Sequence, residues 1–252
     1  MRVTLLVTCL VDVFEPDVGS ATVRVLRAAG CDVSCDLDQT CCGQPAWNAG
    51  FADDAARVAR TTLEALEREL AAGAEAVVVP AGSCAAMVRV FWPELFEAVG
   101  DHAAAERARS VAGCTFELTE LLAARADHLP PLRLGRPVTV AWHRSCHHLR
   151  ELRADDAATA LLDRIVGCER VTWSGDDRCC GFGGLFSFKL PETSVAMADD
   201  KLAALAATDA EVVAGTDSSC LVHLRGRAAA EGRPIVTRHV AEVLAAALPA
   251  VT

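Results

Sequence analysis

The sequence lacks two features that would place it in common functional classes. No apolar run approaches the roughly 18 to 20 residues that a membrane-spanning helix needs, although apolar residues make up 52% of the chain. There is no basic tract, and 34 acidic against 24 basic side chains give a net charge of −10, which argues against binding to a nucleic-acid backbone. We therefore expect no membrane span and no nucleic-acid partner, while a peripheral membrane contact stays open.

The N-terminus also lacks a convincing export signal. The apolar stretch 3–11 is too short for a spanning helix, and no small-residue cleavage site follows it. We expect a cytoplasmic protein, and in that compartment cysteine clusters usually serve metal binding or redox chemistry rather than disulfides. A chain of 252 residues can bury a core that needs no disulfide support. The twelve cysteines therefore need another explanation.

Eight of the cysteines form an internal repeat. Three stations in the first half recur in the same order in the second half, at offsets of 137, 138 and 136 residues. The stations are Cys9, the pair Cys41-Cys42, and Cys84, which are matched by Cys146, the pair Cys179-Cys180, and Cys220. We interpret the chain as a duplicated domain. The copies would span residues 1–130 and 131–252, with their boundary in the proline-rich segment 127–137.

Within each half, strand-like and helix-like segments alternate, as in βαβ proteins. The predicted strands are 3–8, 31–37, 76–79, 138–142, 169–173, 211–214 and 235–238. The predicted helices are 20–29 with Ser20 as its N-cap, one beginning at Gly82-Ser83-Cys84, and 53–70, 152–166, 192–206, 220–230 and 239–248. This pattern predicts an α/β fold of two pseudo-symmetric tandem domains, each a parallel-type sheet flanked by helices. The cysteine stations follow strands, and ligands bind at the carboxyl ends of parallel strands.

Each half thus offers four thiolates from three separate loops. The stations are 32 to 42 residues apart, which excludes a zinc knuckle with its close CxxC pairs. Four soft ligands suit an iron–sulfur cluster or tetrahedral zinc. Gly43 and Gly181, which follow the cysteine pairs, can supply the turn that lets two adjacent side chains face one centre. A bulky cluster accommodates three distant loops better, so we favour iron–sulfur, with zinc as the alternative for one half.

Other residues have more than one interpretation. The remaining cysteines, 31, 35, 114 and 168, fit core packing. His143, His147 and His148 flank Cys146 and could either contact a cluster or serve structure alone. The segment GFGGLF lacks the GxGxxG spacing of a dinucleotide site, so we expect no NAD binding. Adjacent cysteines could also form a vicinal disulfide, but the repeated sets of four favour ligation.

The cysteine stations resemble the cysteine-rich CCG domain family, which includes the cysteine-rich subunit of heterodisulfide reductase and the glycolate oxidase iron–sulfur subunit. Its lactate-utilization subfamily is resembled by segments 7–19, 39–50, 80–87, 145–151, 177–192 and 220–227. The resemblance implies an iron–sulfur electron-transfer subunit of a cytoplasmic complex that oxidises L-lactate to pyruvate. It also implies a ferredoxin-like iron–sulfur partner subunit, and it identifies no catalytic residue.

At the third station the sequence departs from the wider family, whose heterodisulfide reductase type has CxxC. Here the last position is Met87 in one half and His223 in the other. An ordinary [4Fe-4S] cluster on four cysteines is therefore the simpler expectation, with one or two clusters per chain. The alternatives are a subunit that serves glycolate or another 2-hydroxy acid, and a zinc-bound scaffold without redox activity.

Overall fold

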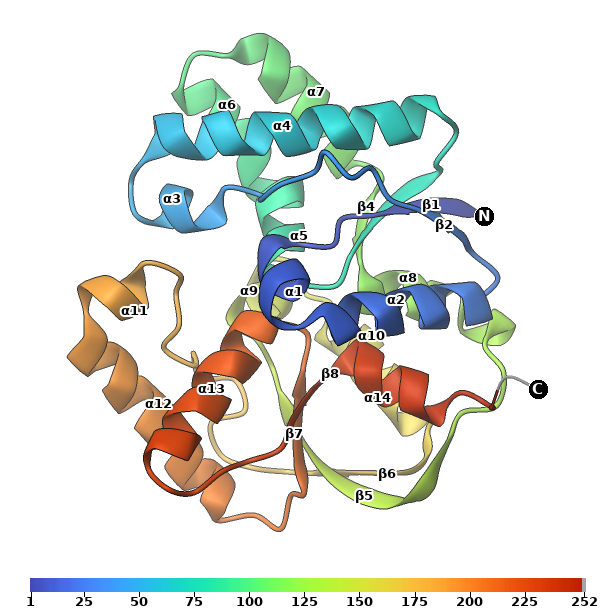
Figure 1. Ribbon diagram of the computed structural model, residues 1–252, viewed down its shortest axis with the longest axis vertical. Helices are drawn as coiled ribbons and strands as arrows, with labels where there is room; N and C mark the ends of the chain where they lie inside the picture. The colour runs from blue at the N-terminus through green and yellow to red at the C-terminus, as the bar shows by residue number, and fades with distance from the viewer. Residues whose placement is uncertain (251–252) are drawn as a thin grey trace.

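A computed structural model describes residues 1–250 of the chain, which forms two four-stranded sheets flanked by helices (Figure 1). The strand orders are β2-β1-β3-β4 and β6-β5-β7-β8, and every pairing is parallel. In each sheet the central strand pairs equivalently, since Val3 lies opposite Ala76 as Val140 lies opposite Val212. The predicted α/β fold with two pseudo-symmetric sheets is therefore confirmed.

The strands of the first sheet are short, and β3 is buried along its whole length. Their bounds are β1 (Arg2–Leu5), β2 (Asp32–Ser34), β3 (Ala76–Val79) and β4 (Thr115–Glu117). The second sheet consists of β5 (Arg133–His143), β6 (Val166–Val171), β7 (Val212–Gly215) and β8 (Thr237–His239). Apolar side chains fill both faces of β3, as expected for a parallel strand covered by helices on both sides.

Helices connect the strands and cover both sheets. Those of the first half are α1 (Cys9–Phe14), α2 (Pro16–Ala28), α3 (Gln44–Asn48), α4 (Ala52–Ala71), α5 (Gly82–Ala86), the π-helix η1 (Met87–Phe91), α6 (Trp92–Ala98), α7 (His102–Ala112), α8 (Leu118–Ala124) and the 3₁₀ turn η2 (Ala126–His128). Those of the second half are α9 (Cys146–Arg150), α10 (Asp155–Asp163), α11 (Phe186–Lys189), α12 (Pro191–Ala206), α13 (Ser218–Ala230) and α14 (Val240–Ala247). In the described residues, no helix combines the length and hydropathy needed to cross a bilayer.

The first connection differs from the sequence prediction. Strand β1 ends at Leu5 rather than at Thr8, because Thr8 adopts a φ of 73° and the chain turns there into the unpredicted helix α1. Helix α2 then begins at Pro16, whose missing N–H costs nothing in a first helical turn. Ser20 therefore lies inside α2, and its prediction as an N-cap was wrong.

Strand β5 also extends beyond its prediction. It begins at Arg133 and so includes the end of the segment 127–137 that we interpreted as the boundary between the two copies. The parallel pairing with β6 shifts register between Arg133 and Val138, which marks the entry into the regular part of the strand. The domain boundary after residue 130 stays a prediction.

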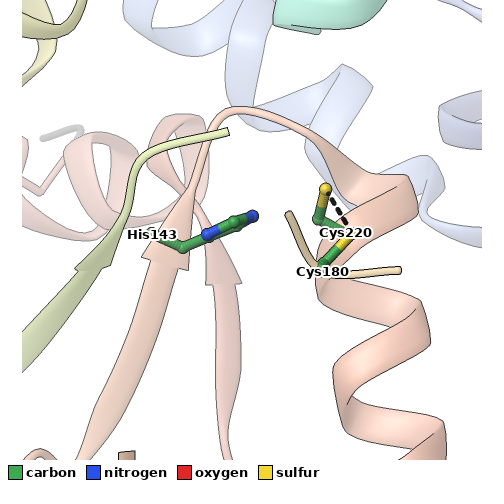
Figure 2. A group of neighbouring side chains, drawn as sticks. All are labelled: His143, Cys180 and Cys220. Atoms are coloured by element: carbon green, nitrogen blue, oxygen red, sulfur yellow. Dashed lines mark hydrogen bonds between the residues drawn. The ribbon is translucent and has the colours of Figure 1, made fainter. Parts of the chain in front are cut away.

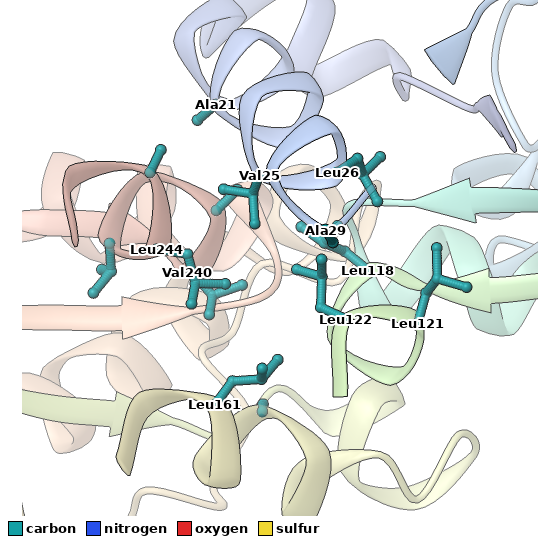
Figure 3. Close-up of a cluster of buried hydrophobic side chains, with 14 of the residues drawn as sticks. Ala21, Val25, Leu26, Ala29, Leu118, Leu121, Leu122, Leu161, Val240 and Leu244 are labelled. Carbon is teal, nitrogen blue, oxygen red and sulfur yellow. The ribbon is translucent and has the colours of Figure 1, made fainter. Parts of the chain in front are cut away.

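The two halves share one hydrophobic core. Helices α2 and α8 of the first half pack against α10 and α14 of the second half (Figure 3). Leu26, Leu122, Leu161 and Leu244 meet there, each almost completely buried. On another side, α5 packs against α9 and α1 against α13. This shared packing fixes the carboxyl ends of the two sheets relative to each other.

Candidate metal centre

All eight repeated cysteines line one cavity of about 260 Å³ between the two halves. We call Cys9, Cys41, Cys42 and Cys84 the first cysteine set, and Cys146, Cys179, Cys180 and Cys220 the second. In each set the single cysteines lie in the first turn of a helix that follows a central strand. The adjacent pairs lie in the loops before α3 and α11. The fold thus brings together six segments that are far apart in the sequence.

Within each set the thiols are close together. The Sγ atoms of Cys9 and Cys41 are 3.5 Å apart, and those of Cys42 and Cys84 are 3.3 Å apart. In the second set, the Sγ atoms of Cys180 and Cys220 are 2.9 Å apart. No disulfide joins any cysteine in the described part of the chain. Cys31 packs in the core as expected, whereas the other three cysteines outside the repeat are only partly buried.

Hydrogen bonds among the thiols favour at least one thiolate in each set. The pKa of Cys41 is lowered to about 3 because Cys42 and Cys9 donate hydrogen bonds to its sulfur. The pKa of Cys179 is lowered to about 2 by equivalent bonds from Cys146 and Cys180. The pKa of Cys42 is raised, since its thiol donates and is buried. In each set these hydrogen bonds therefore favour the thiolate, the form that binds metals.

A glycine after each cysteine pair makes this geometry feasible. Gly43 has a φ of +85° and Gly181 a φ of +90°, a region that side-chain-bearing residues rarely adopt. A Cβ atom at Gly43 would lie 2.7 Å from the carbonyl oxygen of Ala55, and one at Gly181 would lie 2.5 Å from that of Ser194. The glycines thus supply the predicted turn, and they also let the first cysteine pair approach α4 and the second approach α12.

His143 lies at the second cysteine set (Figure 2). It ends β5, is completely buried, and has a nitrogen within 4.8 Å of the Sγ atoms of Cys180 and Cys220. Neither ring nitrogen has a hydrogen-bond partner among the described residues. The pKa of Cys220 is lowered to about 6, first by a hydrogen bond from Cys180 and then by the nearby His143 ring. His143 could therefore contact a metal or cluster held by this set.

The other histidines have different environments. His147 lines the cavity, and its Nδ1 is 3.2 Å from a carboxylate oxygen of Glu151. His148 is completely buried away from the cavity, 3.3 Å from Glu117. The Nε2 atom of His223 is 3.3 Å from the hydroxyl of Ser194, and its ring meets the edge of Phe182. Met87, which occupies the position equivalent to His223 in the first half, is buried in the core. The residues three positions after Cys84 and Cys220 therefore have different environments.

Two side chains that the sequence did not point to donate hydrogen bonds to backbone carbonyl oxygens at or just before the cysteine pairs. In the first half, the Thr62 hydroxyl donates to the carbonyl oxygen of Cys41 over 3.1 Å. In the second half, the buried ammonium of Lys201 donates to the carbonyl oxygen of Arg178 over 2.6 Å, and to those of Gly175 and Asp176. The available signal was the position of Lys201 on the helix face of Ala198 and Leu205, since lysine is almost never fully buried without partners.

Comparison with known proteins decides the family. A profile of the cysteine-rich domain (CCG) matches residues 3–89 and 140–225, one copy in each half. Lactate utilization protein A from Exiguobacterium is 41% identical over 96% of this chain and 96% of its own length. The chain belongs to the lactate utilization protein A family of cysteine-rich CCG domain proteins.

Other members of the family are similar over the same extent. The lactate utilization proteins A from Shouchella clausii and Bacillus licheniformis are each 39% identical over 97% of this chain, and cover 98% and 99% of their own lengths. The two profile matches contain all eight residues of the cysteine sets. The duplication inferred from the cysteine offsets is thus confirmed as two tandem domains of one family.

Proposed function

We propose that the chain is an iron–sulfur subunit that relays electrons in the oxidation of L-lactate to pyruvate. The observation that carries this proposal is the meeting of eight cysteine thiols, in two sets of four, around one cavity. The choice of lactate as the substrate is based on the relatives named lactate utilization protein A. Cys9, Cys41, Cys42 and Cys84 would hold one cluster, and Cys146, Cys179, Cys180 and Cys220 the other.

The donor chemistry of both sets fits a [4Fe-4S] cluster, which takes four thiolates. The sulfurs of each set are free, close together and partly or fully buried. When bound, such a cluster accepts and releases electrons at a potential set by its surroundings. The chain's own contribution is to position the ligands and limit access of water, which Leu10, Phe182 and Leu185 do from the cavity wall.

The partner would be a ferredoxin-like iron–sulfur subunit in the cytoplasm. The cavity gives it a route of approach, because Phe188 lines the cavity while 79% of its surface is exposed. Aromatic side chains such as this one are enriched where proteins contact partners. Electrons would then pass between the partner and the clusters that the two cysteine sets would hold.

Growth of a deletion strain tests the substrate. We expect loss of growth on L-lactate, normal growth on glycolate, and recovery with the wild-type gene. A C179S/C180S variant should fail to restore growth, whereas C31S should restore it because Cys31 packs in the core away from the cavity. Undiminished growth on L-lactate would contradict the assignment, and a defect on glycolate alone would favour another 2-hydroxy acid.

A second candidate is a scaffold that binds zinc in one half. The observation in its favour is the trio of His143, Cys180 and Cys220, whose ligand atoms lie within 4.8 Å of one another and are of the types found in zinc sites. Such a chain would assemble partner subunits without carrying electrons. Stoichiometric zinc with no iron in anaerobically purified protein would favour the scaffold over the electron carrier.

A further inference from the structure

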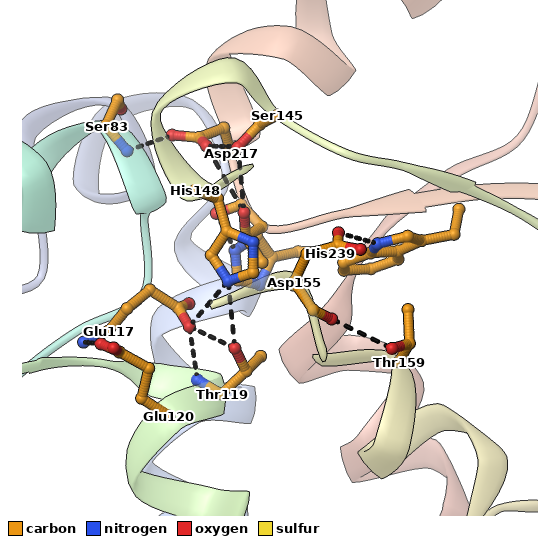
Figure 4. Close-up of polar contacts among 12 residues, drawn as sticks. Ser83, Glu117, Thr119, Glu120, Ser145, His148, Asp155, Thr159, Asp217 and His239 are labelled. Atoms are coloured by element: carbon orange, nitrogen blue, oxygen red, sulfur yellow. Dashed lines mark hydrogen bonds and ion pairs between the residues drawn. The ribbon is translucent and has the colours of Figure 1, made fainter. Parts of the chain in front are cut away.

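One buried carboxylate contacts both halves of the molecule beside the cysteine sets. Asp217 lies between β7 and α13 and is 2% exposed. Its Oδ1 atom accepts a hydrogen bond of 2.9 Å from the backbone N–H of Ser83, which belongs to the first half. Its Oδ2 atom accepts a hydrogen bond from the hydroxyl of Ser145 in the second half (Figure 4). Both carboxylate oxygens are therefore used.

These contacts reach three cysteine stations at once. Ser83 directly precedes Cys84 of the first set, and Ser145 directly precedes Cys146 of the second. Asp217 itself lies one helical turn before Cys220. The helices that carry the two serines, α5 and α9, also pack against each other. A change at Asp217 would thus move the backbone beside ligands of both sets.

The local packing leaves little freedom at this contact. A Cβ atom at Gly82 would lie 2.7 Å from the Cβ atom of His148 and 3.0 Å from Oδ2 of Asp217. The backbone at Gly82 therefore lies directly against side chains of the second half. In the first half, the position equivalent to Asp217 is occupied by Ala81. Alanine has no carboxylate, so this contact is made by the second half alone.

The hydrogen bonds hold the carboxylate in place. Burial would raise the pKa of Asp217, but the bonds from Ser145 and Ser83 outweigh burial and lower it. A buried carboxylate whose partners are fixed is costly to displace. The carboxylate therefore acts as a rigid link between the segment before Cys84 and the segment before Cys146.

We propose that Asp217 is a positioning residue shared by the two cysteine sets, so that this residue of the second half sets the geometry of the metal centre in the first half. The proposal rests on the proposed function only for the identity of the bound group. It predicts that the two centres respond together to a change at one side chain, although their ligands come from different halves.

A full-length C179S/C180S chain provides the test, because only the first cysteine set then remains complete. In this background we compare D217A, D217N and D155A. Asp155 is the matched control, since it is a buried aspartate whose side chain bonds Trp142 and Arg144, all within the second half. The readouts are the EPR spectrum of the first centre and the rate at which a chelator removes its iron.

We expect D217A to shift the EPR spectrum of the first centre and to speed iron loss about tenfold or more, the range seen when a residue that supports metal ligands is removed. D155A should change neither readout. D217N should behave nearly as the parent, because an amide can accept from Ser83 and donate to Ser145. Equal behaviour of D217A and D155A would overturn the proposal.

The test separates this proposal from the proposed function. If the parent chain binds no iron, the electron-transfer role fails, and the same variants are compared with Co²⁺ bound to the first set. A change in the Co²⁺ absorption spectrum in D217A alone would still support Asp217 as the shared positioning residue. Identical Co²⁺ spectra in D217A and D155A would overturn it.

Discussion

At the scale of single residues, the two cysteine sets differ in the residue near the end of the central strand beside them, which is Leu6 in the first half and His143 in the second. His143 stands 137 residues after Leu6, the same offset that relates Cys146 to Cys9. Leu6 packs among apolar side chains, whereas His143 faces Cys180 and Cys220 with both nitrogens free of other partners in the described chain. The repeated fold thus offers an apolar environment at one set and a nitrogen donor at the other.

Replacing His143 by leucine should lower the reduction potential of the second centre. An N–H group directed at thiolate or cluster sulfur stabilises the reduced, more negative state. H143Q, which keeps an N–H donor, should restore part of the potential. H223L is the control, since His223 contacts Ser194 rather than a cysteine. A redox titration followed by EPR measures these potentials, and an unchanged second potential in H143L would argue against the contact.

The glycines after the cysteine pairs give a second prediction. G43A should destabilise the chain more than G50A, although both residues have a φ of +85°. Both variants pay the roughly 1–2 kcal/mol of a left-handed backbone, but only Gly43 faces a carbonyl oxygen at 2.7 Å. Urea unfolding measures the difference. Equal midpoints for the two variants would show that the close approach to Ala55 is unimportant.

At the scale of elements, α12 and α4 hold the loops that carry the cysteine pairs. Lys201 of α12 bonds three carbonyl oxygens before Cys179, and Thr62 of α4 bonds the carbonyl oxygen of Cys41. A buried ammonium has three N–H donors, and here each one has a carbonyl partner. Lys201 thus ties three residues of the segment before the second cysteine pair to α12.

K201M should therefore release iron from the second centre while the first centre stays loaded. The substitution removes a donor from three carbonyl oxygens. Those of Gly175 and Asp176 keep backbone donors, from Arg178 and Arg144, so the cost of about 1–3 kcal/mol for an unpaired buried acceptor falls on the carbonyl of Arg178. K189M is the control, because Lys189 lies above the ring of Phe51, outside this loop. Iron analysis and EPR of each variant check the result, and equal iron loss from both centres would contradict it.

The sequence predicted most elements because their signals are local. The apolar segment 76–79 and the amphipathic segment 53–70 coincide closely with β3 and α4. The cysteine offsets likewise indicated the eight residues that line the cavity, and their role as ligands stays a prediction. Ser20 and the end of β1 were mispredicted because a positive φ at Thr8 and a proline at the start of α2 set those boundaries. The link through Asp217 depends on how the halves pack, which no local pattern records.

At the scale of the whole molecule, the shared core makes the two domains one structural unit. Helices of both halves bury their apolar faces against each other, and the carboxyl ends of the sheets face a common cavity. The repeat therefore does more than provide two sites. It places two sets of four thiols within one cavity.

The shared cavity also predicts a link between metal content and folding. Removing the metal should lower the melting temperature of the whole chain in one transition, because ligands that bind only the folded state stabilise it. Calorimetry of the loaded and chelator-treated protein checks this. Two separate transitions would show that the halves unfold independently despite the core around Leu122 and Leu244.

Iron and acid-labile sulfide analysis of anaerobically purified protein, combined with EPR of the dithionite-reduced sample, tests the central claim most directly. The account predicts a coloured protein with about four iron and four sulfide for each occupied cysteine set, and an EPR signal that C179S/C180S alters. A colourless protein with stoichiometric zinc and no sulfide would contradict it.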